Sequence, residues 1–179
     1  MRILTVTILG LVGVIVLLLG MVALIGSRLP VSHVATRSIW LPQPPETVYG
    51  LIRDFPKASS WRSDVTSVEM LGETGGKLRY REHGKQGDVT YELVQDINAQ
   101  RIVTRIVDQD LGYSGSWTIE FAGENNGTQV RITENGEVSN VMFRFMSRYF
   151  FGHTSTIDGY LTELGKHFNQ SEGKLKISG

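Results

Sequence analysis

One uninterrupted apolar segment near the start of the chain limits where the rest of the protein can work. Residues 3–26 contain no charged residue, no amide side chain and no proline, and only Thr5 and Thr7 among them are polar. As a helix rising 1.5 Å per residue, this segment is about 36 Å long, which exceeds the roughly 30 Å of a bilayer's hydrocarbon core. The sequence therefore predicts a transmembrane anchor over residues 1–28, with residues 3–26 in contact with the lipid bilayer.

A cleavable signal peptide is the alternative interpretation of this segment. The apolar part of a signal peptide usually spans about 7–15 residues and is followed by a cleavage site with small residues. Cleavage after Ala35 would place His33 where a small residue is needed, and cleavage after Ser27 would place Ile25 there. We therefore expect an uncleaved anchor.

The charges on either side of the apolar segment bear on its orientation. Arg2 and the α-amino group lie on one side, and Arg28 and Arg37 lie on the other, so the positive-inside comparison is nearly balanced. A very short N-terminal flank usually stays in the cytoplasm, which would carry the rest of the chain outward. We therefore expect a single-pass protein of the cell membrane whose soluble domain lies outside the cytoplasm. The absence of cysteine suits an oxidising compartment without requiring one.

The length and charge of the remaining chain exclude several classes of function. About 150 residues follow the anchor, which is the size of one ordinary domain with a single core. The whole chain carries 18 basic and 18 acidic residues, and Lys and Arg form no cluster. A nucleic-acid-binding protein normally needs a basic surface to neutralise phosphates, so we expect no nucleic-acid partner. Four scattered histidines give no metal-ligand spacing, and no Walker or dinucleotide-binding loop is present, so we expect no metal and no cofactor.

The first part of the domain combines a strand with short helices. Residues 29–32 are the expected linker between the anchor and a domain over residues 33–169. Residues 33–41 carry the β-branched and aromatic residues typical of a strand. A proline pair then precedes residues 46–55, whose apolar residues fall at helical spacing and predict a short amphipathic helix. Residues 57–62 are expected to form one further helical turn.

The middle of the domain changes to a period of two. Six segments alternate apolar and polar residues, and each ends in turn residues, which predicts an antiparallel meander. These segments are 64–72, 77–84, 87–97, 100–108, 113–123 and 127–138.

The helical period returns at the end of the domain. One long amphipathic helix is predicted over residues 141–168, because apolar residues recur there at three- and four-residue steps along one stripe. Gly152, Gly159 and Gly165 are the positions at which this helix would bend, and the polar residues 170–179 are expected to be disordered. The stripe consists of Met142, Met146, Tyr149, Phe150, His153, Ile157, Leu161, Leu164 and Phe168.

The order of these elements predicts an α+β fold preceded by one transmembrane helix. In this fold a curved antiparallel sheet wraps around a long C-terminal α-helix, with two short helices after the first strand. The twist of a sheet lifts its edges away from a straight helix and leaves a space between the two. We expect this space to be a ligand cavity.

Several motifs occur in an order that is typical of one superfamily. Residues 35–39 (ATRSI) lead into residues 44–49 (PPETVY), residues 115–119 (GSWTI) lie in a late strand, and residues 127–133 (GTQVRIT) precede the last helix. In these motifs the chain resembles the START-like helix-grip superfamily (SRPBCC, Bet v 1-like), and best its bacterial polyketide cyclase/dehydrase and lipid-transport group. The resemblance covers about residues 33–169. It implies the helix-grip fold and a hydrophobic pocket, but no common catalytic motif.

Alternation along the strands predicts which side chains line the pocket. Trp117, Ile119 and Phe121 are the apolar set of their strand and should face the helix, and the same period turns Ile132 and Glu134 inward. The predicted ligand-binding residues are Tyr80, Tyr91, Thr104, Trp117, Ile119, Phe121, Ile132, Met146, Phe150, His153 and Ile157.

Three polar residues of the inward set, Glu82, Glu134 and His153, are the weak candidates for acid–base catalysis. An apolar cavity raises the pKa of a carboxylate, and a carboxylate paired with a histidine could then transfer protons. The alternative places both carboxylates at the wet mouth of the cavity and the histidine, hydrogen-bonded, at the edge of the helix stripe. The alternative is favoured for all three residues, so none is assigned as catalytic.

Four further residues bear on contact with the membrane. Trp40 and Trp61 are candidates for an aromatic belt at the membrane surface, although plain packing is favoured for Trp61. Arg144 and Arg148 lie four apart on the flank of the last helix. A solvated helix face explains the two arginines better than contact with lipid phosphates.

The leading interpretation is a membrane-anchored, non-enzymatic domain that binds a hydrophobic small molecule, such as a lipid, a quinone or a polyketide-like compound. Tethering a cavity to the bilayer raises its effective concentration near ligands dissolved in the membrane. One alternative is a cyclase- or dehydratase-type enzyme that uses Glu82, Glu134 or His153. The other is a protein-interaction module with a collapsed cavity, whose partner the sequence does not identify. An interior filled by the protein's own aromatic side chains would favour this last alternative.

Overall fold

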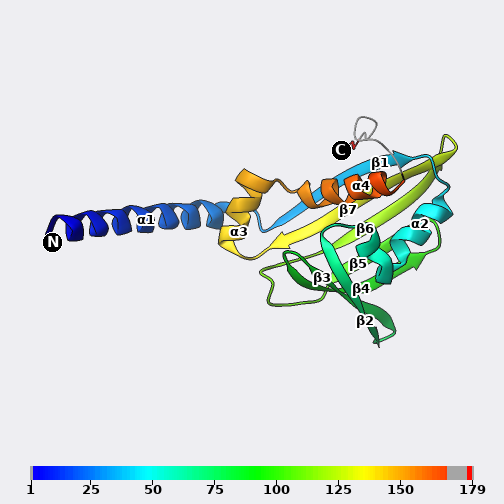
Figure 1. Ribbon diagram of the computed structural model, residues 1–179, viewed down its shortest axis with the longest axis horizontal. Coiled ribbons are helices and arrows are strands. Elements are labelled where there is room, and N and C mark those ends of the chain that lie inside the picture. The colour runs from blue at the N-terminus through cyan, green and yellow to red at the C-terminus, as the bar shows by residue number, and fades with distance from the viewer. Residues whose placement is uncertain (1, 169–176, 179) are drawn as a thin grey trace.

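The computed structural model describes residues 2–168 and 177–178, and it begins with one long helix, α1 (Arg2–Arg28). Figure 1 shows α1 as a rod that projects away from the rest of the chain. Its segment Thr7–Arg28 has a mean hydropathy of 3.1 and packs none of its most apolar stretch against the domain. By length and composition, α1 is therefore a candidate membrane span.

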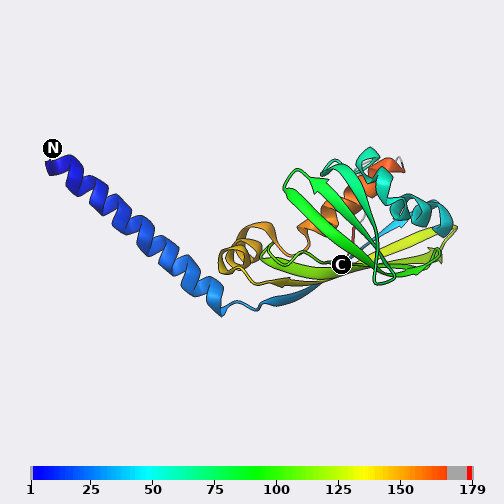
Figure 2. The ribbon, with the colours of Figure 1, turned by 90° about the horizontal axis from the view of Figure 1, so that it is seen from below.

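Seven antiparallel strands form one sheet in the order β1-β7-β6-β5-β4-β3-β2. The strand that follows α1, β1, pairs along its whole length with the last strand, β7, so the first and last strands of the domain are neighbours in the sheet. The sheet curves strongly, and Figure 2 shows β2, β3 and β4 rising over one face of it. The predicted meander is confirmed. The strands are β1 (Ser32–Leu41), β2 (Val65–Thr74), β3 (Lys77–Gly84), β4 (Gly87–Ile97), β5 (Arg101–Ile106), β6 (Tyr113–Glu124) and β7 (Gly127–Val138).

Two short helices follow β1, as the sequence predicts. The helix α2 (Pro45–Arg53) begins at a proline, which suits the first turn of a helix, and buries Val48 and Ile52. The 3-10 helix η1 (Phe55–Ser60) buries Phe55 and leads to Trp61, which is itself buried.

The prediction of one continuous helix over residues 141–168 is wrong. The segment forms a short helix α3 (Val141–Met146), a π-helical turn η2 (Ser147–Phe151) and a separate helix α4 (Ser155–His167). The helix ends at Gly152, whose φ of 73° lies in the left-handed region that favours glycine. Gly152 was one of the three predicted bends.

Of α3, η2 and α4, only α4 has fully buried apolar residues, so the predicted apolar stripe divides into two parts. Ile157, Leu161 and Leu164 on α4 are fully buried in the core. Met142, Tyr149 and Phe150, before the break, are exposed. The stripe continues through both parts, but the sheet covers only the second.

Two further expectations concern the aromatic belt and the tail. Trp61 is buried, and Trp40 lies at the end of β1 farthest from α1, so neither can sit at the surface of a membrane that α1 crosses. Most of the predicted disordered tail, residues 170–179, lies outside the described residues. The described residue Ser178 forms an isolated bridge with Ser38 on β1.

Candidate functional site

The inner face of the sheet carries most of the side chains that the sequence assigns to the pocket. The strand register places Tyr80 beside Tyr91, and Thr104 beside Trp117. It likewise places Ile119 beside Ile132. Phe121 is buried on the same face and packs edge-on against Tyr49 of α2. From α4, Ile157 joins the same core cluster. The alternation that the sequence shows thus matches the observed face of each strand.

The space between this face and α4 is occupied by aromatic rings. Tyr160 of α4 meets Trp117 edge-on at 5.5 Å between ring centroids, and Trp61 at 5.2 Å. Tyr80 stacks on Phe55 at 4.1 Å and lies 5.4 Å from Tyr91. The interior is therefore lined, and largely filled, by the protein's own rings.

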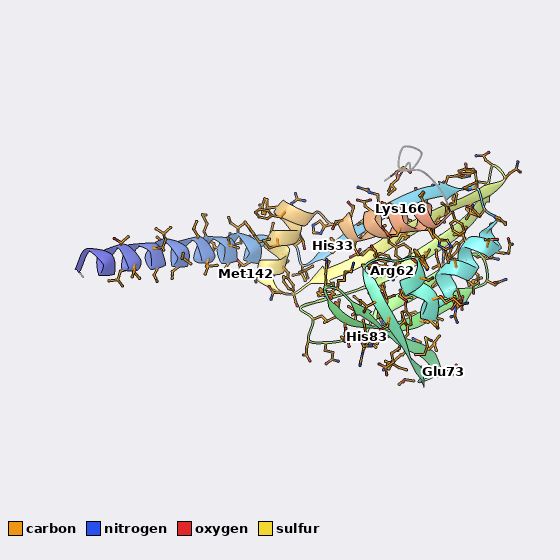
Figure 3. All side chains as sticks on the ribbon, viewed as in Figure 1. His33, Arg62, Glu73, His83, Met142 and Lys166 are labelled. Carbon is orange, nitrogen blue, oxygen red and sulfur yellow. The ribbon has the colours of Figure 1, made fainter. Side chains whose placement is uncertain are left out.

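An ion pair lies among these rings. The guanidinium of Arg62 donates from Nη1 to Oε1 of Glu82 at 2.7 Å and from Nη2 to Asp64 at 2.7 Å. Only 14% of the Arg62 side chain and 11% of the Glu82 side chain are exposed. The guanidinium also lies over the ring of Tyr160, 5.2 Å from its centroid. Figure 3 shows Arg62 within the body of the domain.

Burial sets the protonation behaviour of this centre. Loss of solvation raises the pKa of Glu82, and the charge and hydrogen bond of Arg62 act in the opposite direction. Burial lowers the pKa of Arg62, but the hydrogen bond to Asp64 and the charge of Glu82 outweigh it and raise that pKa. Arg62 therefore forms an ion pair with Glu82 inside the domain and shares its guanidinium with the more exposed carboxylate of Asp64.

Three phenol groups surround this pair: Tyr80, Tyr91 and Tyr160. Burial raises the pKa of each phenol, and the negative charge of Glu82 raises it further, so all three stay neutral. Among the described residues, none of these hydroxyls has a hydrogen-bond partner. The indole Nε1 of Trp61 is also buried without a described partner. The interior therefore holds several polar groups that no described residue satisfies.

A second polar cluster lies on the same face, nearer to α1. The ring of His33 on β1 stacks on that of His153 at 4.3 Å, and its Nε2 lies 3.4 Å from Oε1 of Glu134. The other carboxylate oxygen of Glu134 is buried without a described partner. Burial lowers the pKa of His153, and the charges of His33 and Arg148 lower it further. Figure 3 shows His33 closer to α1 than Arg62 is.

The candidate residues thus separate into two groups. Glu82 lies in the ring-lined centre, whereas Glu134 and His153 lie together in the cluster nearer to α1. Met146 and Phe150 belong to α3 and η2 instead, and Phe150 is exposed. Neither belongs to the core cluster that includes residues of α4, and Gly152 separates both from α4.

Sequence reasoning missed Arg62, Tyr160 and His33. Arg62 occupies a polar turn, where a charged residue is usually solvated, and its burial arises from contact with a strand twenty residues away in sequence. Tyr160 lies between the apolar positions Ile157 and Leu161 of α4, and that spacing was the available signal. His33 gave no signal, because its partners come from β7 and from the break before α4.

The structure also contains a groove lined mainly by residues of β5, β6 and β7. Its volume is about 550 Å³, and two of its lining residues, Arg101 and Glu120, form an ion pair. The lining residues are Ile97, Gln100, Arg101, Glu120, Phe121, Ala122, Gln129 and Arg131. We regard the inner face as the functional site, because it holds buried polar groups in an apolar surround. The described residues contain no group of three His, Asp or Glu side chains placed to hold a metal ion.

The fold and this interior define a START-like helix-grip protein. Residues 32–153 match the family described as polyketide cyclase / dehydrase and lipid transport, and the chain belongs to this family. The superfamily and the α+β helix-grip fold predicted from the sequence are confirmed.

Solved structures share the fold at low sequence identity. A START superfamily protein from Mycobacterium smegmatis aligns with a TM-score of 0.60 at 14% identity, over 77% of this chain and 98% of that one. A protein from Thermus thermophilus aligns with a TM-score of 0.60 at 22% identity, over 77% and 97%. The di-domain ARO/CYC protein BexL from the BE-7585A biosynthetic pathway aligns with a TM-score of 0.61 at 16% identity, over 82% of this chain and 52% of that one. No curated protein matches the chain.

Proposed function

We propose that this protein binds a mainly apolar small molecule with at least one neutral polar group, and that it does so at a membrane in which α1 is inserted. The binding place is the space between the inner face of the sheet and α4. The observation that carries the proposal is the set of unsatisfied polar groups inside a ring-lined interior. These are the indole Nε1 of Trp61, which is buried without a described partner, and the hydroxyls of Tyr80, Tyr91 and Tyr160, which have no hydrogen bond to a described residue.

The energetics favour a ligand that supplies hydrogen bonds at these groups. A buried donor without a partner, as at Trp61 Nε1, costs about 1–3 kcal/mol, which a carbonyl or hydroxyl of the ligand would recover. The charge of Arg62 is already neutralised by Glu82 and Asp64, so the interior favours a neutral polar group over an anion. A lipid, a quinone or a polyketide-like compound has this combination of apolar bulk and neutral oxygen atoms.

The rings that fill the interior have to move when the ligand binds. Tyr160 comes from α4, and among the strands α4 approaches β1 most extensively. The start of α4 is fixed to β1 by an ion pair between Arg37 and Asp158, with 3.1 Å between Nε and Oδ1. Displacement of α4 from the other strands, with this attachment kept, would open the space beneath Tyr160.

The membrane part of the proposal rests on α1. A cavity held at the bilayer surface meets ligands dissolved in the membrane at a high effective concentration, without any further contact. The proposal keeps the expectation that the domain lies outside the cytoplasm, since the short N-terminal flank favours that orientation.

Native mass spectrometry of the full-length protein, extracted gently from membranes, tests the proposal. We expect a stable mass increment that denaturation releases and identifies as a lipid, a quinone or a related compound. Tyr91→Phe removes only a hydroxyl and should weaken binding about threefold to tenfold, the usual cost of one neutral hydrogen bond. Tyr113→Phe, outside the core cluster, is the matched control. A clean unliganded mass, unchanged after incubation with membrane extract, would refute the proposal.

An enzyme of the cyclase or dehydratase type is the second candidate, and the raised pKa of Glu82 favours it. A carboxyl group in an apolar interior can act as a general acid or base. This candidate requires that Glu82→Gln abolishes turnover of a bound compound while binding persists. Equal loss of binding and turnover would assign Glu82 to ligand binding instead.

The filled interior favours a third candidate, a protein-interaction module. In that case the interior rings are core side chains, and a partner protein binds on the outside of the sheet or the helix. Absence of any small-molecule increment, together with a single protein recovered by cross-linking in intact membranes, would support it.

A further inference from the structure

The most exposed large apolar side chains of the domain gather next to α1. Among the described large apolar residues after α1, the four highest exposed fractions are 70% for Val34, 67% for Phe150, 57% for Tyr149 and 48% for Phe143. Val34 lies at the start of β1, and the other three lie on α3 and η2. Soluble domains rarely leave apolar side chains gathered in this way unless something covers them.

Direct packing holds these side chains at the level of the last turn of α1. Gly26 lies against Val141 so closely that a side chain at position 26 would meet the carbonyl oxygen and Cγ1 of Val141. Arg144 donates from Nη1 to the carbonyl oxygen of Leu29 at 3.1 Å. Figure 3 shows Met142, the second residue of α3, where α1 meets the domain. The segment α3–η2 (residues 141–151) therefore lies where α1 would leave a membrane.

The charges of this segment are all of one sign. Arg144 and Arg148 are its only charged residues, and the last residue of α1 is Arg28. Arg28 and Arg148 are both exposed. Aromatic rings beside arginine side chains are the usual composition of a segment that lies in the interface of an anionic bilayer.

We propose that α3–η2 lies in the interfacial layer of the same membrane that α1 crosses. Phe143, Tyr149 and Phe150 enter the boundary between headgroups and acyl chains, and Arg28 and Arg148 contact anionic lipid phosphates. This inference rests on the proposed membrane insertion of α1. The covering surface is a lipid surface rather than a second protein, because α3 packs directly on the end of α1. An inserted α1 therefore holds the segment at the depth of the bilayer surface. The end of the inner face that carries His33 and His153 then faces the bilayer.

Single spin labels test this arrangement in the full-length protein, since the chain contains no cysteine that would compete for labelling. Phe150→Cys reports on η2, Val12→Cys reports on the middle of α1, and Gln86→Cys in the β3–β4 turn is the aqueous control. Each labelled protein is reconstituted in phosphatidylcholine vesicles with and without phosphatidylglycerol. Collisions with oxygen, which enters bilayers, are compared with collisions with a water-soluble nickel chelate.

We expect the labels at positions 12 and 150 to lose access to the nickel chelate and keep access to oxygen, while position 86 stays accessible to both. The label at position 150 should lie deeper in vesicles that contain phosphatidylglycerol than in vesicles without it. Arg148→Gln should abolish this difference in depth between the two kinds of vesicle. If the nickel chelate reaches the label at position 150 but not the label at position 12, this inference is overturned while the membrane insertion of α1 stands. Protection of position 150 from both reagents would indicate protein contact and also overturn it. An aqueous position 12 would refute the membrane insertion of α1 and this inference with it.

Discussion

The two halves of the C-terminal helical region share one apolar pattern but have opposite environments. On α4, Ile157, Leu161 and Leu164 are fully buried against the sheet. On α3–η2, Phe143 and Phe150 are among the most exposed side chains of the domain. Both halves satisfy the same three- and four-residue spacing, and Gly152 separates them.

This difference shows what an amphipathic pattern does and does not determine. The pattern indicates that one face of a helix avoids water, but it does not identify what covers that face. For α4 the cover is the inner face of the sheet. For α3–η2 we propose that it is the membrane surface. Substitutions that act differently on the two halves can therefore test the comparison.

The largest expected difference is between Leu161→Ala and Phe150→Ala. Leu161 is fully buried, so its truncation leaves a cavity in the core and should cost about 2–5 kcal/mol of unfolding free energy. Phe150 is 67% exposed, so its truncation should change the unfolding free energy by no more than about 0.5 kcal/mol. Urea unfolding of the detergent-solubilised protein, followed by tryptophan fluorescence, measures both. Equal destabilisation by the two changes would show that η2 packs on the core after all.

A smaller effect is expected from Gly26→Val, which acts on the junction between α1 and α3. The new side chain would overlap Val141, and overpacking of this kind costs about 1–3 kcal/mol or forces the contact apart. Paired spin labels at Leu17 and Gln86 should then give a broader distribution of distances than in the parent protein. Gly20→Val is the matched control, since nothing lies within 4 Å of a side chain there. An unchanged distribution in Gly26→Val would mean that the junction does not fix α3–η2 at the end of α1.

Much of the fold could be predicted because strands impose a strict period of two. Tyr80, Trp117 and Ile132 were placed on the inner face from alternation alone, and the register brings them to one surface. The turns between strands could also be predicted from turn residues. Asn125 and Asn126, for example, adopt the positive φ that hairpin turns require. These features are local, so the sequence carries them directly.

The parts that could not be predicted depend on contacts between distant segments. Burial of Arg62 results from η1 folding over the sheet, which places its guanidinium on Glu82. The stacking of His33 on His153 joins the first strand to the break before α4. Neither contact leaves a periodic signal, because each joins a single residue to another far along the chain.

The smallest expected effect is a pH dependence of stability at the break between the two halves. Burial, together with the charges of His33 and Arg148, lowers the pKa of His153 below its usual value of 6.5, so the folded protein disfavours the protonated ring. Above the unfolded pKa, the ring is neutral in both states and contributes nothing. As the pH falls below the unfolded pKa, the unfolded chain binds the proton more readily, so the folded state loses stability until the pH passes the folded pKa.

Urea unfolding at neutral and at mildly acidic pH measures this effect. The drop in the urea midpoint from neutral to mildly acidic pH should be smaller in His153→Gln than in the parent protein. An identical acid response in the parent and in His153→Gln would show that this histidine does not couple protonation to the packing of α4.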